Sequence, residues 1–105
     1  MHSRDLAHCD LKPLNIVLNR SFNPKLIDFG HAQVAKGEPK QKGSWHYMAP
    51  ELIFPKRRSE ILDHDEEYNY KYADCWSLGV TLFQMFYKVL PFDLNSKLFK
   101  VLELS

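Results

Sequence analysis

The stretch HCDLKPLN at residues 8–15, followed by DFG at residues 28–30, decides how this 105-residue chain is interpreted. Four side chains in these strings can carry chemistry: Asp10, Lys12, Asn15 and Asp28. Carboxylate and amide oxygens are ligands for Mg²⁺, and a lysine neutralises charge on a phosphoryl group. Because phosphoryl transfer depends mainly on positioning and charge neutralisation, we predict a site that holds Mg²⁺ and a nucleotide γ-phosphate beside a substrate hydroxyl.

The composition is that of a soluble globular protein, with 45% hydrophobic and 26% charged residues. A chain of this length is one domain or a part of one. The net charge of +1 gives no argument for a nucleic-acid partner. Cys9 and Cys75 are too few and too far apart for a disulfide framework or a zinc site, so we expect an intracellular, cytoplasmic protein.

No membrane segment is expected. The N-terminal residues contain no apolar run of the kind found in a signal peptide. The most apolar stretch, residues 78–90, is 13 residues long and is interrupted by Gln84 and Lys88. A helix needs roughly 20 apolar residues to cross a bilayer, so this stretch is too short.

The pattern of apolar runs and turn residues predicts a mixed, mostly helical chain. Short strands are expected at 16–18 and 25–27, joined as a hairpin by a turn that contains Asn and Pro. The polar residues 31–44 are expected to form a mobile loop. Helices are expected from residue 49, with Pro50 in the first turn, over 72–88, with apolar residues on every face, and over 94–104.

The ordered motifs resemble the larger, C-terminal catalytic lobe of a eukaryotic protein kinase of the Ser/Thr type. The matching strings are HCDLKPLN at 8–15, DFG at 28–30, APE at 49–51 and DCWSLG at 74–79. The resemblance implies an α+β, mostly helical fold, a partial protein-kinase-like C-lobe with a short β-hairpin beside the catalytic loop. It divides residues 1–105 into a catalytic loop (8–15), an activation segment (28–51), an insert (55–69) and a core helix (72–88).

The resemblance also assigns roles, which we state as expectations. Asp10 would accept or orient the proton of a protein Ser or Thr hydroxyl, and Lys12 would neutralise charge on the γ-phosphate of ATP. Asn15 and Asp28 would bind Mg²⁺ and, with Lys12, would hold the nucleotide. Lysine at position 12 is similar to Ser/Thr kinases and unlike tyrosine kinases.

A second aspartate, Asp5, follows Arg4 and imitates the family motif. The residue five positions after Asp5 is Asp10 and not asparagine, and the residue two positions after it is Ala7 and not lysine. Only Asp10 has both partners at the required spacing. We therefore expect residues 1–7 to be the end of a helix that precedes the catalytic loop.

Cys9 departs from the arginine that most phosphorylation-regulated kinases have at this position, so the chain resembles a non-RD kinase. Cysteine cannot pair with a phosphate, and residues 31–43 contain no Ser, Thr or Tyr. We therefore expect no switch by phosphorylation of this loop. Ser44 is expected to contact Asp10 and Lys12, as the family's hydroxyl residue does, and phosphorylation of Ser44 that raised activity would contradict the hypothesis.

Other expectations follow from the same resemblance. Asp74 would hydrogen-bond the backbone of the catalytic loop, while Trp76 and Leu78 would pack in the core. Glu51 would lack the arginine partner that the family has in a later helix. Lys88 replaces the glycine of the family's turn before Pro-Phe, so that turn is expected to be altered.

The chain contains no glycine-rich loop and no strand lysine of the Val-Ala-Ile-Lys type. In the family these parts belong to the smaller N-terminal lobe, which would precede Met1 in the same polypeptide. We therefore expect the 105 residues alone to be inactive, with ATP and a Ser/Thr protein substrate as partners of the complete kinase. The alternative is a non-catalytic binding or decoy module derived from a kinase.

Overall fold

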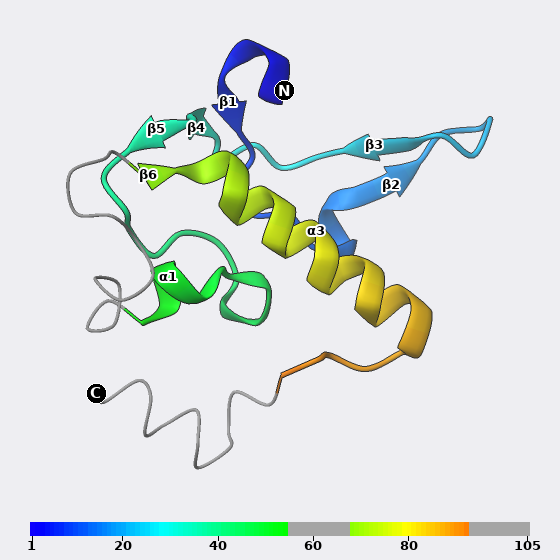
Figure 1. The fold of residues 1–105 in the computed structure, drawn as a ribbon. Coiled ribbons are helices and arrows are strands. Elements are labelled where there is room, and N and C mark those ends of the chain that lie inside the picture. The colour runs from blue at the N-terminus through cyan, green and yellow to red at the C-terminus, as the bar shows by residue number, and fades with distance from the viewer. Residues whose placement is uncertain (55–67, 93–105) are drawn as a thin grey trace.

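A computed structural model describes residues 1–54 and 68–92 of the chain (Figure 1). The helix predicted over 94–104 and most of the insert predicted over 55–69 lie outside the described residues. One long helix, α3 (Tyr70–Tyr87), runs through the molecule, and short strands and turns surround its N-terminal half. The short helix α1 (Pro50–Ile53) starts at the predicted proline.

Within residues 1–54 and 68–92, six short strands form three separate antiparallel pairs. The pairs are β1 (Leu6–Ala7) with β4 (Gln33–Val34), β2 (Ile16–Leu18) with β3 (Pro24–Leu26), and β5 (Lys36–Gly37) with β6 (Tyr68–Asn69). The described residues also form three 3₁₀ turns: η1 (His2–Arg4), η2 (Pro13–Asn15) and η3 (Trp45–Tyr47). The pairing of β1 with β4 joins the start of the chain to residues that follow the DFG string.

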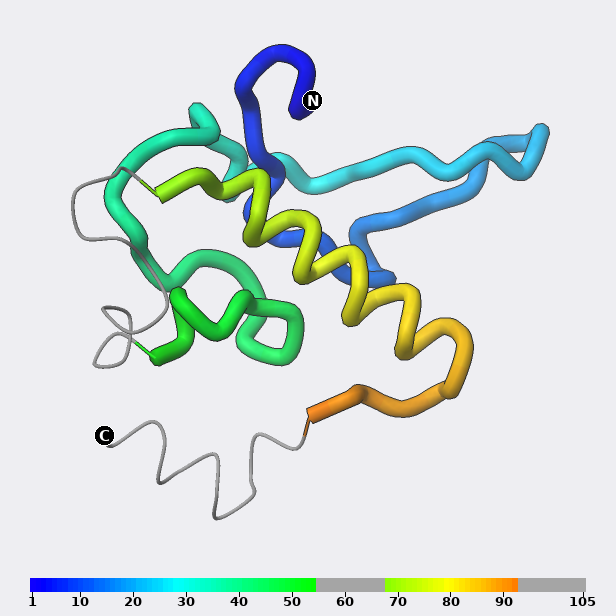
Figure 2. Tube along the Cα trace, viewed as in Figure 1, coloured from blue at the N-terminus to red at the C-terminus, as the bar shows by residue number. Residues whose placement is uncertain are grey.

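The predicted hairpin is present and projects from the rest of the chain (Figure 2). Its first strand has the predicted bounds, and its second starts one residue earlier than predicted, at Pro24. The turn is closed by Asn19, whose side-chain oxygen accepts from the backbone N–H groups of Ser21 and Asn23 at 2.8 and 3.0 Å. This is the local hydrogen bonding that favours asparagine in turns.

Two predictions about the segments that flank the hairpin are wrong. Residues 1–7 form the turn η1 and the strand β1, and not the end of a long helix. Residues 31–44 are not a plain loop, because they contain both β4 and β5. In both cases backbone partners distant in sequence decide the local structure, and such partners leave no periodic pattern in a two-residue strand.

Helix α3 starts two residues before the predicted position because Asn69 caps it. The Asn69 side chain accepts from the backbone N–H of Lys71 at 3.0 Å, which satisfies one of the free donors in the first turn. Among the described residues, no helix has both the length and the apolar character to cross a membrane.

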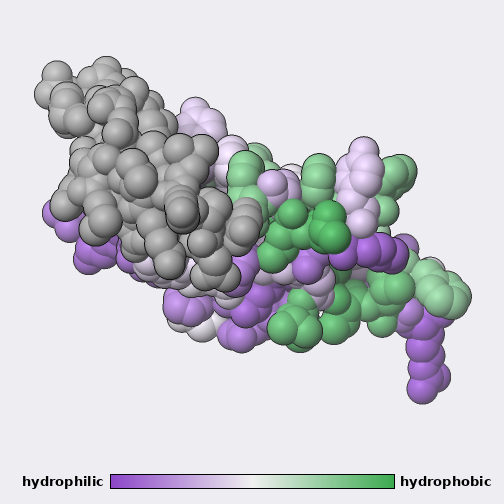
Figure 3. All heavy atoms as spheres, turned by 90° about the horizontal axis from the view of Figure 1, so that it is seen from below, coloured by the Kyte–Doolittle hydropathy of each residue, from purple (hydrophilic) through white to green (hydrophobic). Residues whose placement is uncertain are grey.

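The core lies between the N-terminal half of α3, helix α1 and the 8–15 loop. Its buried members are Ala7, Cys9, Met48, Ala49, Leu52, Ile53, Tyr68, Tyr70 and Ala73. The expectation that Trp76 and Leu78 pack in this core is wrong, because they are 36% and 43% exposed. Further along α3, Leu82, Met85 and Phe86 are also exposed. Hydrophobic residues are visible on the surface of the molecule (Figure 3).

The turn after α3 retains the backbone conformation that glycine favours, although lysine occupies it. Lys88 has a φ of 64°, and its N–H donates to the Gln84 carbonyl at 2.8 Å. A side chain in this left-handed region costs roughly 1–2 kcal/mol, and glycine avoids that cost. Lys88 therefore adopts the left-handed backbone conformation that glycine favours at this position.

We expect Lys88→Gly to raise the free energy of unfolding by about 1 kcal/mol, because it removes the left-handed strain. The measurement is urea unfolding followed by circular dichroism. Lys88→Ala is the control, since alanine keeps the strained Cβ and should give no such gain. Equal stabilisation by glycine and alanine would contradict the strain argument.

Candidate active site

The structure brings Asp10, Lys12 and Asn15 together on one short loop. Asp10 and Asn15 are buried, and the Asn15 amide nitrogen donates to the Asp10 backbone carbonyl at 2.8 Å. The same nitrogen lies 3.4 Å from Oδ2 of Asp10. The Lys12 ammonium group lies 4.0 Å from this oxygen. The carboxylate of Asp10 is therefore held between an amide and a cation.

Ser44 links the loop to the segment that follows the DFG string. Its backbone N–H and its hydroxyl each lie 3.1 Å from Oδ1 of Asp10, and both can donate to it. The Lys12 ammonium group donates to the same hydroxyl at 2.8 Å. The predicted contacts of Ser44 with Asp10 and Lys12 are thus confirmed, and they fix which way the Asp10 carboxylate points.

Asp28 lies on an exposed turn at the base of the hairpin. The backbone N–H of Ile27 donates to the Asn15 carbonyl at 2.9 Å, so the chain delivers Asp28 close to the end of the 8–15 loop. Asp28 has a φ of 58°, and its Oδ1 accepts from the Gly30 N–H at 3.3 Å. Within the described residues, no hydrogen bond or ion pair joins the Asp28 carboxylate to Asp10, Lys12 or Asn15.

The donor set of Asn15 and Asp28 fits Mg²⁺. Both hydrogen bonds of the Asn15 side chain use its nitrogen, so the amide oxygen remains available, and Asp28 adds an exposed carboxylate. Mg²⁺ is usually held by one or two such oxygens together with phosphate oxygens and water. The described residues contain no cluster of three or more His, Cys, Asp or Glu side chains suited to a metal.

Asp74, on α3, supports the loop from below, as predicted. Its two carboxylate oxygens accept from the backbone N–H groups of His8 and Cys9 at 2.8 and 2.9 Å. The carboxylate is only 2% exposed. A third partner, which no sequence pattern indicated, is the His2 ring, whose Nε2 lies 2.9 Å from Oδ2 of Asp74.

His8 connects the loop to the DFG string. Its Nδ1 accepts from the backbone N–H of Asp10 at 3.2 Å, and its Nε2 donates to the Ile27 carbonyl at 2.8 Å. Both bonds require the neutral ring with the proton on Nε2. The ring also packs against Phe29, with centroids 5.1 Å apart. His8 is therefore a structural residue, with both ring nitrogens occupied by hydrogen bonds.

Gly43 was not singled out from the sequence, and the structure shows why this position needs glycine. Its φ is +86°, and an added Cβ would lie 2.4 Å from the Cys9 carbonyl oxygen and 3.1 Å from Oδ1 of Asp10. Glycine therefore allows the backbone to approach the 8–15 loop closely enough for Ser44 to reach Asp10. A glycine just before Ser44 in a polar segment was the only available signal.

Glu51, which the resemblance predicts to lack the arginine of a later helix, is bound by a tyrosine hydroxyl. The Tyr68 hydroxyl donates to the Glu51 carboxylate at 2.5 Å, and both residues are buried. Burial, followed by the neighbouring carboxylate, raises the pKa of Tyr68, so the phenol remains a donor at neutral pH. Tyr68, at the end of the predicted insert, therefore stabilises the buried Glu51 carboxylate.

Cys9 is a buried thiol with little reactivity. Its left-handed backbone has a φ of 68°, and the thiol lies 3.7 Å from the Ala7 carbonyl oxygen. Burial, and then the charge of Asp74, raise the pKa of the Cys9 thiol to about 11. Only the thiolate is nucleophilic, so Cys9 remains unreactive at neutral pH.

We expect iodoacetamide at pH 7.5 to alkylate Cys75, which is exposed, and to leave Cys9 unmodified in the folded protein. Because the pKa of Cys9 is raised, its reaction should increase only as the pH approaches about 11. Peptide mass spectrometry after a timed reaction measures each site. In the Cys75→Ser variant the folded protein should take up no label, and labelling of Cys9 at neutral pH would contradict the burial argument.

Comparison with known proteins agrees with this geometry. A family model described as "Protein kinase domain" matches residues 1–103. The chain belongs to the eukaryotic protein kinase superfamily.

Individual relatives carry kinase names. The chain is 38% identical over 108 residues to the "Serine/threonine-protein kinase ULK3" of Xenopus laevis, a match that covers 98% of this chain and 20% of that protein. It is 38% identical over 88 residues to a "Probable serine/threonine-protein kinase HAL5-like" of Eremothecium gossypii, covering 76% and 12%. An "Aurora kinase" of Eremothecium gossypii is 35% identical over 100 residues, covering 92% and 24%. The chain thus spans at most about a quarter of these relatives' lengths.

Proposed function

We propose that this chain is part of the larger, C-terminal lobe of a Ser/Thr protein kinase. The complete enzyme would transfer the γ-phosphate of ATP to a Ser or Thr hydroxyl of a protein. The observation that carries the proposal is the arrangement around Asp10, whose Oδ1 accepts from Ser44 while Lys12 binds the same serine hydroxyl. A carboxylate and an ammonium group are thereby fixed side by side, as in-line phosphoryl transfer requires.

The proposed roles follow from what each side chain can do. Asp10 orients the substrate hydroxyl and takes up its proton, since its carboxylate is held rigidly and retains acceptor capacity at Oδ2. Lys12 offsets the charge on the transferring phosphoryl group. Asn15 and Asp28 would contribute oxygen ligands for Mg²⁺, which when bound would neutralise charge on the phosphates.

The preference for Ser and Thr rests on two independent supports. Lys12 lies within hydrogen-bonding distance of the activation segment at Ser44, and this lysine is the residue that resembles the Ser/Thr class. Two of the relatives described above carry Ser/Thr kinase names. Substrate and nucleotide remain part of the proposal, because the chain spans only a fraction of those proteins.

The test uses one polypeptide in which a kinase N-terminal lobe, with its glycine-rich loop and strand lysine, precedes this chain. Labelled phosphate from ATP is followed into three peptides that differ only in a Ser, Thr or Tyr acceptor. We expect transfer to Ser and Thr and not to Tyr, and no transfer by the 105 residues alone.

The same assay distinguishes the alternative of a binding or decoy module. A fused protein that melts cooperatively and binds the peptides, yet labels none of them, would overturn the kinase proposal. Transfer to the Tyr peptide alone would overturn the assignment to the Ser/Thr class while keeping the kinase activity.

A further inference from the structure

Tyr70 is a buried tyrosine that faces the activation segment from the first turn of α3. It is 1% exposed and belongs to the core, and its ring packs edge-on against Tyr68 with centroids 5.0 Å apart. A buried tyrosine normally needs partners for its hydroxyl. The partners in this structure are backbone groups of a segment that lies 30 residues earlier in the chain.

The Tyr70 hydroxyl bridges two points of that segment. It donates to the Glu38 carbonyl at 2.7 Å and accepts from the backbone N–H of Lys40 at 2.9 Å. The backbone N–H of Tyr70 donates to the Ala35 carbonyl at 2.7 Å. One residue therefore makes three hydrogen bonds to residues 35–40, which lie just before Gly43 and Ser44.

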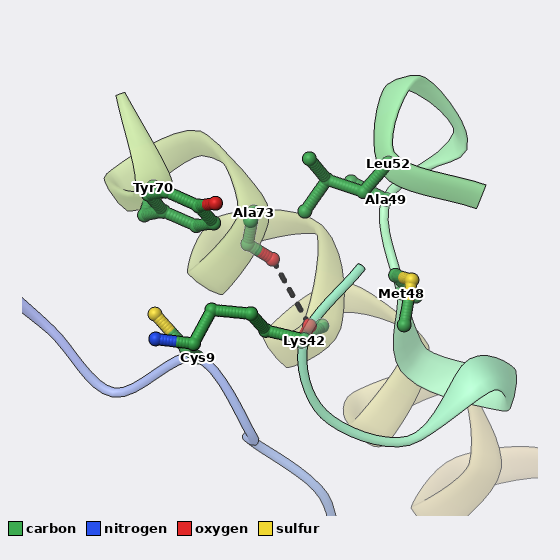
Figure 4. Close-up of a pocket in the computed structure, with 8 residues that line it drawn as sticks. Cys9, Lys42, Met48, Ala49, Leu52, Tyr70 and Ala73 are labelled. Carbon is green, nitrogen blue, oxygen red and sulfur yellow. Dashed lines mark hydrogen bonds between the residues drawn. The ribbon is translucent and has the colours of Figure 1, made fainter. Parts of the chain in front are cut away.

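A fourth contact continues the same interaction toward the active site. The Lys42 ammonium group lies 5.9 Å from the centre of the Tyr70 ring, and it also donates to the Gln33 side chain. A cation over an aromatic face at this distance is attracted to it. Lys42, Tyr70 and Cys9 line the same pocket (Figure 4), so the contact lies directly beside the 8–15 loop.

The sequence of the activation segment gives no indication that a phosphate holds it. Residues 31–43 contain no Ser, Thr or Tyr that could carry a phosphate. Cys9, which is buried and uncharged at neutral pH, could not bind one. Tyr70 instead contacts the segment through neutral hydrogen bonds and through the ring contact with Lys42.

We propose that Tyr70 is a positioning residue that holds residues 35–42 in the conformation needed for activity, without any phosphate. Holding Lys42 fixes the backbone that leads into Gly43, whose close approach to Cys9 lets Ser44 bind Asp10. The consequence for catalysis rests on the proposed function. The expected effect of Tyr70 on the conformation of residues 35–42 does not depend on the proposed function.

The first test is hydrogen exchange of the backbone amides, which needs no catalysis. In the unaltered protein we expect the Lys40 amide to exchange more slowly than the amide of Gln41, which has no acceptor among the described residues. Equal exchange at the two amides would overturn the proposal even if no variant could be purified.

The second test compares Tyr70→Phe with Tyr72→Phe, a matched control on the same helix with a 68% exposed ring. Removal of the Tyr70 hydroxyl should accelerate exchange at Lys40 roughly tenfold, since the one hydrogen bond that the Lys40 amide makes to this hydroxyl is worth about this factor. The control should leave it unchanged. Unchanged exchange in Tyr70→Phe, with the fold intact, would overturn the proposal.

The third test uses the polypeptide that carries an N-terminal lobe. Tyr70→Phe should lower kcat/KM for the peptide roughly tenfold without changing KM for ATP, because the segment and not the nucleotide site is loosened. Faster exchange at Lys40 with unchanged kcat/KM would overturn the positioning role. Absence of activity in the unaltered enzyme would instead refute the proposed function, and the exchange results would stand.

Discussion

Asp10→Asn is expected to slow phosphoryl transfer about a thousandfold while leaving the fold intact, since a positioned proton acceptor contributes roughly 10²–10⁴ in rate. Asparagine has nearly the same shape and keeps an oxygen for the bonds from Ser44. Its amide cannot take up the proton of the substrate hydroxyl. The measurement is kcat for a Ser peptide, with the N-terminal lobe in the same polypeptide.

The chain provides a matched control in Asp5. This aspartate follows an arginine and imitates the kinase motif, but its side chain is 82% exposed and pairs with Lys71 at 2.8 Å. Asp5→Asn should therefore leave kcat unchanged. Loss of activity in Asp5→Asn together with retention in Asp10→Asn would show that the catalytic loop had been assigned to the wrong aspartate.

The residues of the candidate site were predictable because their chemistry and spacing are local. Asp10, Lys12 and Asn15 lie within six consecutive residues, and short connections leave little freedom in how they are presented. The hairpin at 16–26 was predictable for the same reason, since two apolar runs flank a turn closed by Asn19. Asp28 was found because it begins the DFG string at residues 28–30.

The features that were missed depend on contacts between distant parts of the chain. Glu51 binds Tyr68, 17 residues later, and His2 binds Asp74, 72 residues later. The need for glycine at position 43 comes from the Cys9 carbonyl, which no local pattern reveals. Trp76 was expected to be buried because the helix is apolar on every face, yet that pattern does not tell which face is covered by the described residues.

The expectation that no phosphate holds the activation segment came from the sequence, whereas the contact that Tyr70 makes with this segment did not. Cys9 and the segment without hydroxyl groups argued from the sequence against a phosphate switch. They could not indicate what holds the segment instead, because Tyr70 lies on another element. Its hydroxyl bonds to Glu38 and Lys40 supply a physical answer that the sequence alone could not give.

Asp74→Ala is expected to lower the free energy of unfolding by about 3–5 kcal/mol, because it removes a buried charge that is hydrogen-bonded on both oxygens. The loss leaves the backbone N–H groups of His8 and Cys9 without acceptors inside the protein, and it also releases the His2 ring. Urea unfolding followed by circular dichroism measures the effect.

Asp74→Asn separates the loss of the negative charge from the loss of the hydrogen-bond acceptors. Asparagine keeps one acceptor oxygen but turns an N–H₂ group toward a backbone donor, so its loss should be smaller than that of alanine. Asp5→Ala, at an exposed position, should cause no measurable change. If Asp74→Ala were as stable as the unaltered protein, the 8–15 loop would not depend on α3. In that case the support for Asp10 would have to come from Ser44 and Asn15 alone.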